Sequence, residues 1–225
     1  MTASAVKPPI TAEQLTIVPA NEASWRDLQA IFGPSDYPGL CYCQRYVSTE
    51  WHWSLSTEER RDRLRRQTRC DDPDAESTTG LVAYLTDERH DREPVGWVAV
   101  APRFSYPRLL RGRTPWTGRN EDKHDQGVWS VTCFAVRKGY RGRGITYSLA
   151  AATIDYARDS GARALEAYPM IVPPGKEITW GDMHVGKREV FDDAGFTEVG
   201  RPSHRRVVMR VEFGADRHHH GSLRI

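Results

Sequence analysis

The stretch VTCFAVRKGYRGRGITYSLAAATIDYA, residues 131–157, links an apolar segment to a helical pattern through two arginines that alternate with two glycines. Residues 128–136 are apolar or small at both alternations, which predicts a central strand buried on both faces. From Gly144 to Ser160 apolar side chains recur at helical spacing, and Gly161 stands where helices commonly end. The sequence therefore predicts a strand, a tight turn and a helix, in that order.

The chemistry of this turn suits an anion. The first N–H groups of a helix lack partners within it and its dipole is positive there, so such an end binds anions. Gly142 and Gly144 let the backbone approach a ligand, and Arg141 and Arg143 add charge that suits phosphate. A P-loop or a dinucleotide fingerprint fits less well, because GK[ST] is absent and Tyr147 stands where a third glycine is needed. The alternative is a plain turn with two surface arginines.

The stretch resembles the acetyl-CoA-binding motif of the GCN5-related N-acetyltransferases. In that family a strand ending in V-x-x-x-Y-R-G-x-G leads into the helix that takes the CoA pyrophosphate, and the pattern R/Q-x-x-G-x-G/A falls on residues 141–146. Thr146 departs from the last position, although its N–H and hydroxyl still suit a phosphate. GWVAVAPR at 96–103, LEAYP at 165–169 and DDAGF at 192–196 also resemble an uncharacterised bacterial branch of the family.

The resemblance implies how a co-substrate, acetyl-CoA, is held. Main-chain groups of residues 134–136 would bind the pantetheine arm as an added strand does, and the N–H of Phe134 or a neighbour would polarise the thioester carbonyl. Residues 141–146 would wrap the pyrophosphate, and no metal is expected. The cofactor-binding residues predicted in this way are Phe134, Ala135, Val136, Arg141, Gly142, Arg143, Gly144, Ile145 and Thr146.

The catalytic acid and base are less evident. Many family members carry the acid as a tyrosine four residues before the glycine of the late junction, where this chain has Phe191, and residues 128–136 lack the usual glutamate. Glu166 and Tyr168 share a parity on the next strand, so they should face the same side. We predict that they are catalytic, one as base and the other as acid. The alternative is a paired structural carboxylate and a packed tyrosine.

Two aromatic and sulfur-rich segments fall where family members build the acceptor pocket. These segments are Cys41-Tyr42-Cys43 and Trp51-His52-Trp53. Their aromatic rings could stack on a cationic amine, or they could form a satellite core under a loop. The one-residue spacing of the two cysteines does not fit a closed zinc site with His52. The three histidines at 218–220 are predicted to belong to a frayed terminus.

Composition limits the remaining possibilities. The chain has 225 residues and a formal charge of +2, which favours one domain and argues against bulk binding of nucleic acid. No signal peptide and no apolar run of 18 residues is visible, so we expect a cytoplasmic protein without a membrane partner. We expect a disordered N-terminus over 1–12, a single acetyltransferase domain over 13–214 and a polar tail over 215–225.

The other elements complete an α+β (mixed α/β) fold. We predict a GNAT-like, mostly antiparallel twisted sheet with one βαβ unit, flanked by helices. Residues 33–46, 102–127 and 169–181 are predicted loops, and a loop as long as 102–127 is typical of a functional or mobile segment. The predicted strands besides the central one cover 15–18, 81–86, 94–101, 164–168, 196–201 and 206–213, and the predicted helices besides the one after the turn cover 21–32, 56–69 and 187–194.

The predicted function is acetyl transfer from acetyl-CoA to a primary amine by direct attack in a ternary complex. The acceptor is expected to be a small molecule such as an antibiotic, a polyamine or an amino acid, with a protein amine as second choice. The sequence is also compatible with a homodimer. One alternative is a non-catalytic acyl-CoA-binding or regulatory domain, which Phe191 supports. Another is an RNA-binding module that uses the arginines of 103–119, whose affinity would fall steeply with salt.

Overall fold

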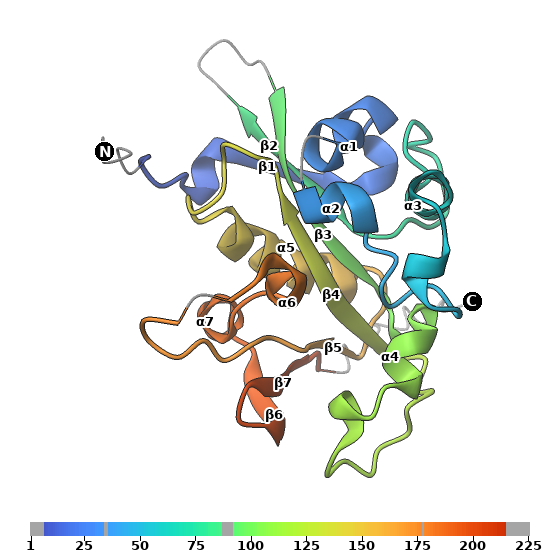
Figure 1. Ribbon diagram of the computed structural model, residues 1–225, viewed down its shortest axis with the longest axis vertical. Helices are drawn as coiled ribbons and strands as arrows, with labels where there is room; N and C mark the ends of the chain where they lie inside the picture. Colours follow the sequence, from blue (N-terminus) through green and yellow to red (C-terminus); the bar gives the residue numbers. More distant parts are fainter. Residues whose placement is uncertain (1–6, 34–35, 87–91, 177, 215–225) are drawn as a thin grey trace, which may run out of the picture.

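The computed structural model describes residues 7–33, 36–86, 92–176 and 178–214, and these residues share one seven-stranded sheet (Figure 1). The strand order is β1-β2-β3-β4-β5-β7-β6, and only β4 and β5 pair in parallel. This confirms the predicted mixed fold with one βαβ unit. The strands are β1 Leu15–Pro19, β2 Leu81–Thr86, β3 Arg92–Pro102, β4 Val128–Val136, β5 Ala164–Ala167, β6 Thr197–Ser203 and β7 Arg206–Glu212.

Helices begin and end where local chemistry permits. Ser56 caps α3 through a reciprocal pair of hydrogen bonds with Glu59, as its sequence predicts, and Gly161 follows α5 with a φ of +81°. None of the described helices is long and apolar enough to cross a membrane. The α-helices are α1 Trp25–Phe32, α2 Asp36–Cys41, α3 Thr57–Thr68, α4 Pro107–Arg111, α5 Ile145–Asp159, α6 Trp180–Met183 and α7 Arg188–Asp193.

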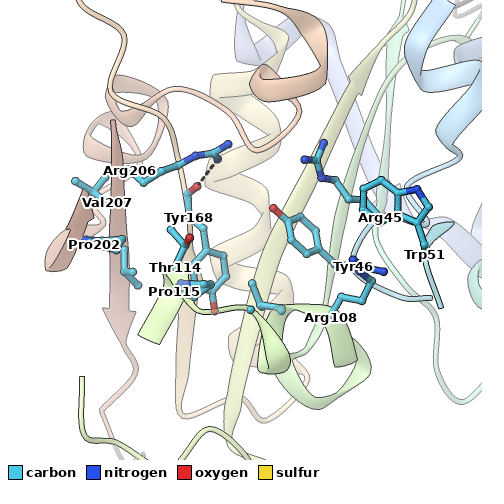
Figure 2. Close-up of a pocket in the computed structure, with 13 residues that line it drawn as sticks. Arg45, Tyr46, Trp51, Arg108, Thr114, Pro115, Tyr168, Pro202, Arg206 and Val207 are labelled. Carbon is cyan, nitrogen blue, oxygen red and sulfur yellow. Dashed lines mark hydrogen bonds between the residues drawn. The ribbon is translucent and has the colours of Figure 1, made fainter. Parts of the chain in front are cut away.

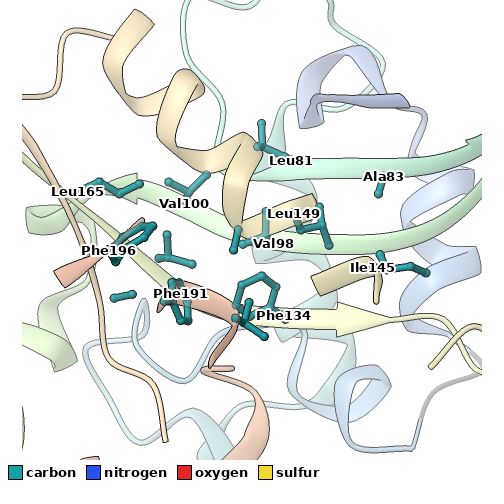
Figure 3. Close-up of a cluster of buried hydrophobic side chains, with 14 of the residues drawn as sticks. Leu81, Ala83, Val98, Val100, Phe134, Ile145, Leu149, Leu165, Phe191 and Phe196 are labelled. Atoms are coloured by element: carbon teal, nitrogen blue, oxygen red, sulfur yellow. The ribbon is translucent and has the colours of Figure 1, made fainter. Parts of the chain in front are cut away.

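Both faces of the sheet are covered, because alternate residues of β3 and β4 are apolar on each side. Val98 and Val100 of β3 pack with Leu149 of α5 in one buried cluster (Figure 3), which also contains Phe191 of α7. Trp97, next to Val98 in sequence, belongs to the opposite cluster with residues of α1. In β4, Phe134 and Val136 belong to the first cluster and Ala135 to the second, so the central strand is buried on both faces, as predicted.

Three segments differ from their sequence-based description. Residues 33–46, predicted as a loop, contain α2. Pro38 does not prevent this helix, because it lies in the first turn, where a missing N–H costs little. The 102–127 segment contains α4 and buries Arg103, Tyr106 and Trp116, so it is a packed part of the fold. Residues 7–12, placed in the disordered N-terminus, lie against the turn before α5, where the N–H of Ile10 donates to the carbonyl of Arg143 at 2.8 Å.

Candidate functional site

The turn before α5 has the left-handed backbone that its glycines allow. Gly142 and Gly144 have φ values of +73° and +90°, a region where other residues are strained. Gly144 is the N-cap residue of α5 and has no side chain, so no side chain caps the first N–H groups of the helix. A Cβ at Gly142 would meet no atom within 4 Å, which leaves open space above the turn. The helix end can therefore receive an anion.

The two arginines of the turn point to different places. Arg141 donates from Nε to the carbonyl of Val136 at 3.1 Å and lines the cavity described below. Arg143 donates from Nε to the carbonyl of Pro8 at 2.8 Å and stacks over Tyr140. Of the two, Arg141 is placed to meet a phosphate, whereas Arg143 holds the N-terminal segment against the turn.

Strands β4 and β5 separate beyond the middle of β4. Their pairing runs from Val128 to Val131 on β4, and the next residue, Thr132, is left over in a bulge opposite β3. Arg137 donates its N–H to Val95 of β3, so by alternation Phe134 and Val136 direct their main-chain groups toward the gap. Ala135, by the same alternation, directs its groups toward β3. The gap lies at residues 134–136, whose main-chain groups the resemblance assigns to the pantetheine arm.

A cavity of about 490 Å³ extends from this gap to the turn. It is lined on its far side by residues of the segment before α7, including Met183 and Gly186. Ala135 and Arg143 are not among its lining residues. Of the nine predicted cofactor residues, those that line it are Phe134, Val136, Arg141, Gly142, Gly144, Ile145 and Thr146.

The N–H of Phe134 already has an acceptor. It donates to the main-chain carbonyl of His184 at 2.6 Å, and Met170 donates to Gly186 two residues further on. The segment that contains α6 thus closes against β4 at the place where the thioester carbonyl was expected. For Phe134 to polarise a thioester, this hydrogen bond has to open.

A small space of about 10 Å³ adjoins this cavity through Phe134 and is rich in sulfur. Burial, followed by the neighbouring Cys133, raises the pKa of the Cys41 thiol to about 12, so that thiol stays protonated at neutral pH. The Cys41 thiol is therefore a poor nucleophile. Cys43 donates from Sγ to Sγ of Cys133 at 2.8 Å. In the described ranges no group of three or more His, Cys, Asp or Glu residues could hold a metal ion, and the side chain of His52 lies outside the description.

A third cavity, of about 290 Å³, shares the lining residues Arg45 and Tyr46 with this small space (Figure 2). The small space thus shares lining residues with both larger cavities, and we call the third one the acceptor cavity. Its other walls come from α4, the residues after it and the β6–β7 hairpin. Its lining residues are Arg45, Tyr46, Trp51, Arg108, Leu109, Gly112, Thr114, Pro115, Tyr168, Pro202, Arg206, Val207 and Val208.

The two predicted catalytic residues lie together but differ in access. Glu166 is completely buried and is absent from the lining of all three cavities. Its carboxylate pairs with Arg103 at 3.2 Å, with Arg210 at 3.0 Å and with Arg119. Glu121 pairs with the same three arginines, which explains why the 102–127 segment is packed.

Tyr168 lines the acceptor cavity, but its hydroxyl is turned toward Glu166. It donates to Oε2 of Glu166 at 2.8 Å and lies 3.1 Å from Oγ of Ser130. Burial, and then the charge of Glu166, raises the pKa of Tyr168 well above its usual value. The hydroxyl is therefore protonated, and it is held away from the gap between β4 and β5.

Sequence reasoning missed four residues that line the small space or the acceptor cavity: Arg45, Tyr46, His184 and Arg206. Arg45 and Tyr46 follow Cys41-Tyr42-Cys43, a segment of the predicted acceptor region, after the single residue Gln44, so their place in the sequence is a usable signal. His184 and Arg206 come from the far end of the chain and meet the others only in the fold. Burial raises the pKa of Tyr46, which keeps its hydroxyl protonated between the two spaces.

Comparison with known proteins places these features in a wider group. A family model described as "Acetyltransferase (GNAT) family" matches residues 45–170, more than half of the chain. No curated protein matches its sequence. A GNAT-family acetyltransferase structure from Bacillus anthracis is 12% identical with a TM-score of 0.50, and the match covers 90% of this chain and 97% of that one. A GCN5-related N-acetyltransferase from Kribbella flavida is 18% identical with a TM-score of 0.49, and covers 90% and 100%. At such identities the likeness is one of fold.

Proposed function

Because this chain belongs to the GNAT acetyltransferase family, we propose that it transfers an acetyl group from acetyl-CoA to the primary amine of a small molecule. The observation that carries the proposal is that two cavities, one beside the turn before α5 and the other the acceptor cavity, share lining residues with the same small space at Phe134. In this proposal each cavity holds one substrate, and the two substrates meet at Phe134. A ternary complex needs this arrangement, because both reactants must be held together before the bond forms.

The residues fit the co-substrate in two ways. The left-handed glycines and the uncapped end of α5 suit a diphosphate, with Arg141 beside it. Val136 and, once its bond to His184 opens, Phe134 offer main-chain groups to an extended arm, as an edge strand does. Acetyl-CoA supplies the activated acyl group, and no metal is invoked.

The reaction forms a C–N bond and breaks the C–S bond of the thioester. The attacking nitrogen loses a proton to solvent, the departing thiolate gains one from an acid, and the acid regains its proton from solvent. Tyr46 is placed to donate that second proton, because it is protonated and lines both the acceptor cavity and the small space at Phe134. In this proposal Tyr168 forms the cavity wall, and Glu166 acts through Tyr168 as the acceptor that fixes its hydroxyl.

The size of the acceptor cavity favours a small molecule. Its 290 Å³ corresponds to roughly ten water molecules at about 30 Å³ each. A protein amine would have to enter as a single side chain, which remains the second choice.

The test is calorimetric titration with acetyl-CoA, followed by detection of free CoA over a panel of primary amines. We expect binding, and CoA release that depends on the amine. Binding without release for any amine would favour the non-catalytic acyl-CoA-binding alternative, and absence of binding would refute both. Titration with single-stranded RNA at two salt concentrations tests the nucleic-acid alternative, which requires an affinity that falls steeply with salt.

A further inference from the structure

The acceptor cavity is strongly basic. Three of its lining residues are arginines, Arg45, Arg108 and Arg206, and none is acidic. Figure 2 shows the guanidinium groups of Arg45 and Arg206 on either side of the Tyr46 hydroxyl, and Arg108 below Arg45. A cavity that receives a polyamine or another polycation would need the opposite charge.

Among the described residues, the present partners of these guanidinium groups are mostly neutral. Arg45 donates to the carbonyl of Gly181 at 2.9 Å and to the Tyr37 hydroxyl at 3.3 Å. Arg108 donates to the main-chain carbonyl of Glu50 at 3.0 Å and stacks over Trp51. Trp51, for which stacking on a cationic amine was one of two open interpretations, thus faces a cation of the chain itself.

In the described part of the chain, Arg206 is the lining arginine that pairs with a carboxylate. That carboxylate belongs to Asp182, which lies 3.7 Å from Arg206 and is shared with Arg205 at 3.8 Å. Burial lowers the pKa of Arg206; Tyr46 and Asp182 oppose this shift, and the charges of Arg45 and Arg205 add to it. Positive charge is therefore gathered in a partly desolvated space, with the loosely placed Asp182 beside Arg206, and a bound anion would relieve the repulsion.

We infer that the acceptor is a small amine that also carries a carboxylate or phosphate group, bound by Arg45 and Arg206 with Tyr46 between them. Guanidinium groups bind both anions through paired hydrogen bonds, and the Tyr46 hydroxyl can donate a further one. Since Arg45 and Tyr46 also line the small space at Phe134, an anion held there brings its amine close to the thioester position. This inference rests on the proposed acetyl transfer, and it sets aside the polyamine expected from sequence.

Matched amines test the inference. The rate of CoA release would be measured for β-alanine against propylamine, for O-phosphoethanolamine against ethanolamine, and for glycine against glycinamide. We expect kcat/KM for the anionic member to exceed that of its neutral partner by at least about 10-fold, as the loss of a hydrogen bond to a charged group predicts. The first and second pairs distinguish a carboxylate from a phosphate acceptor. Equal or faster turnover of the neutral amines, or of spermidine, would overturn the inference and leave acetyl transfer standing.

Binding of an anion provides a readout that does not need catalysis. Inorganic phosphate and N-acetylglycine would be titrated into the wild type, Arg206→Gln, Arg45→Gln and a matched control, Arg205→Gln. Arg205 is next to Arg206 on the same hairpin but is absent from the lining of the acceptor cavity. We expect at least one probe to bind the wild type and the control, and affinity to fall about 10-fold or more in the two cavity variants. Melting temperatures check that each variant is folded.

The outcomes separate the two proposals. Anion binding that depends on Arg45 and Arg206, with no turnover of any amine, would support the anion site and refute acetyl transfer to amines. Failure of both probes to bind the wild type, or unchanged binding in both folded cavity variants, would overturn the anion site whatever the activity.

Discussion

Replacing Glu166 by glutamine should destabilise the fold strongly. The Glu166 side chain is completely buried, and so is that of Arg103, while Arg119 and Arg210 are only 7% and 8% exposed. Glutamine removes the negative charge and directs an amide donor at guanidinium donors. The three arginines would then share Glu121 as their common carboxylate. Of the three, Arg210 would also keep its ion pair with Glu212.

The magnitude follows from burial and from the remaining pairs. Removing one partner of a buried ion pair costs about 3–5 kcal/mol. Glu121 still pairs with all three arginines at 2.5–3.0 Å, so we expect the lower end of that range. For a domain of this size each kcal/mol lowers the melting temperature by about 2–4 °C, so about 3 kcal/mol corresponds to a decrease of about 6–12 °C.

The assay is thermal and urea unfolding of the wild type, Glu166→Gln and the control Glu93→Gln. Glu93 also pairs with an arginine, Arg137 at 2.7 Å, but its side chain is 45% exposed, and such surface pairs contribute at most about 1 kcal/mol. Suppose that Glu166→Gln melts with the wild type while CoA release loses its dependence on pH at the acidic side. Glu166 would then be the catalytic base predicted from sequence, and the reasoning from burial would be refuted.

Three further outcomes are expected. Arg141→Glu should weaken binding of acetyl-CoA at least about 10-fold in calorimetry, whereas Lys138→Glu, on the same turn but outside the cavity lining, should change it little; equal losses would contradict a local phosphate contact. Tyr46→Phe should lower kcat for CoA release by about 10²-fold or more, while Tyr168→Phe should change mainly stability; the reverse pattern would move the acid to Tyr168. Burial raises the pKa of Glu121, but hydrogen bonds from Arg103 and Arg119 lower it by more, so the pKa in the folded protein is below its usual value. The ionised Glu121 therefore stabilises the fold above about pH 4.3, and this stabilisation is lost as the pH falls through the lower folded pKa. Urea midpoints should fall less with acid in Glu121→Gln than in the wild type.

The sheet and the end that holds the co-substrate were predictable because their signals are local. Alternation in β4, helical spacing in α5 and the positive φ of Gly142 and Gly144 each depend on a few neighbouring residues. Helix α2 was missed because Pro38 and Gly39 are turn signals by local rules. Its place in the fold depends on contacts with α3, which no short window of sequence contains.

The acceptor end could not be predicted in the same way. Its lining comes from residues 45–51, 108–115, 168 and 202–208. These meet because β5 pairs with β7 and because Leu109 of α4 packs with Tyr168 and Val208 in one buried cluster. The ion-pair partners of Glu166 were also hidden, since these arginines lie 63, 47 and 44 residues away in sequence. Shared parity with Tyr168 was a correct geometric inference, and the two side chains do touch. What parity could not show is that the surrounding cations bury the carboxylate.

The hydrogen bond from Phe134 to His184 gives the arrangement a further consequence. If the arm of acetyl-CoA pairs with β4, the carbonyl of His184 must leave the N–H of Phe134, and residues 184–186 lose their anchor on that strand. We therefore expect hydrogen exchange at residues 184–186 to become faster when acetyl-CoA binds, while the first amides of α5 become slower because they meet the diphosphate. Slower exchange in both segments would mean that 184–186 stay in place. The thioester would then have to be polarised by a group other than Phe134, and the edge-strand contact proposed for β4 would begin at Val136.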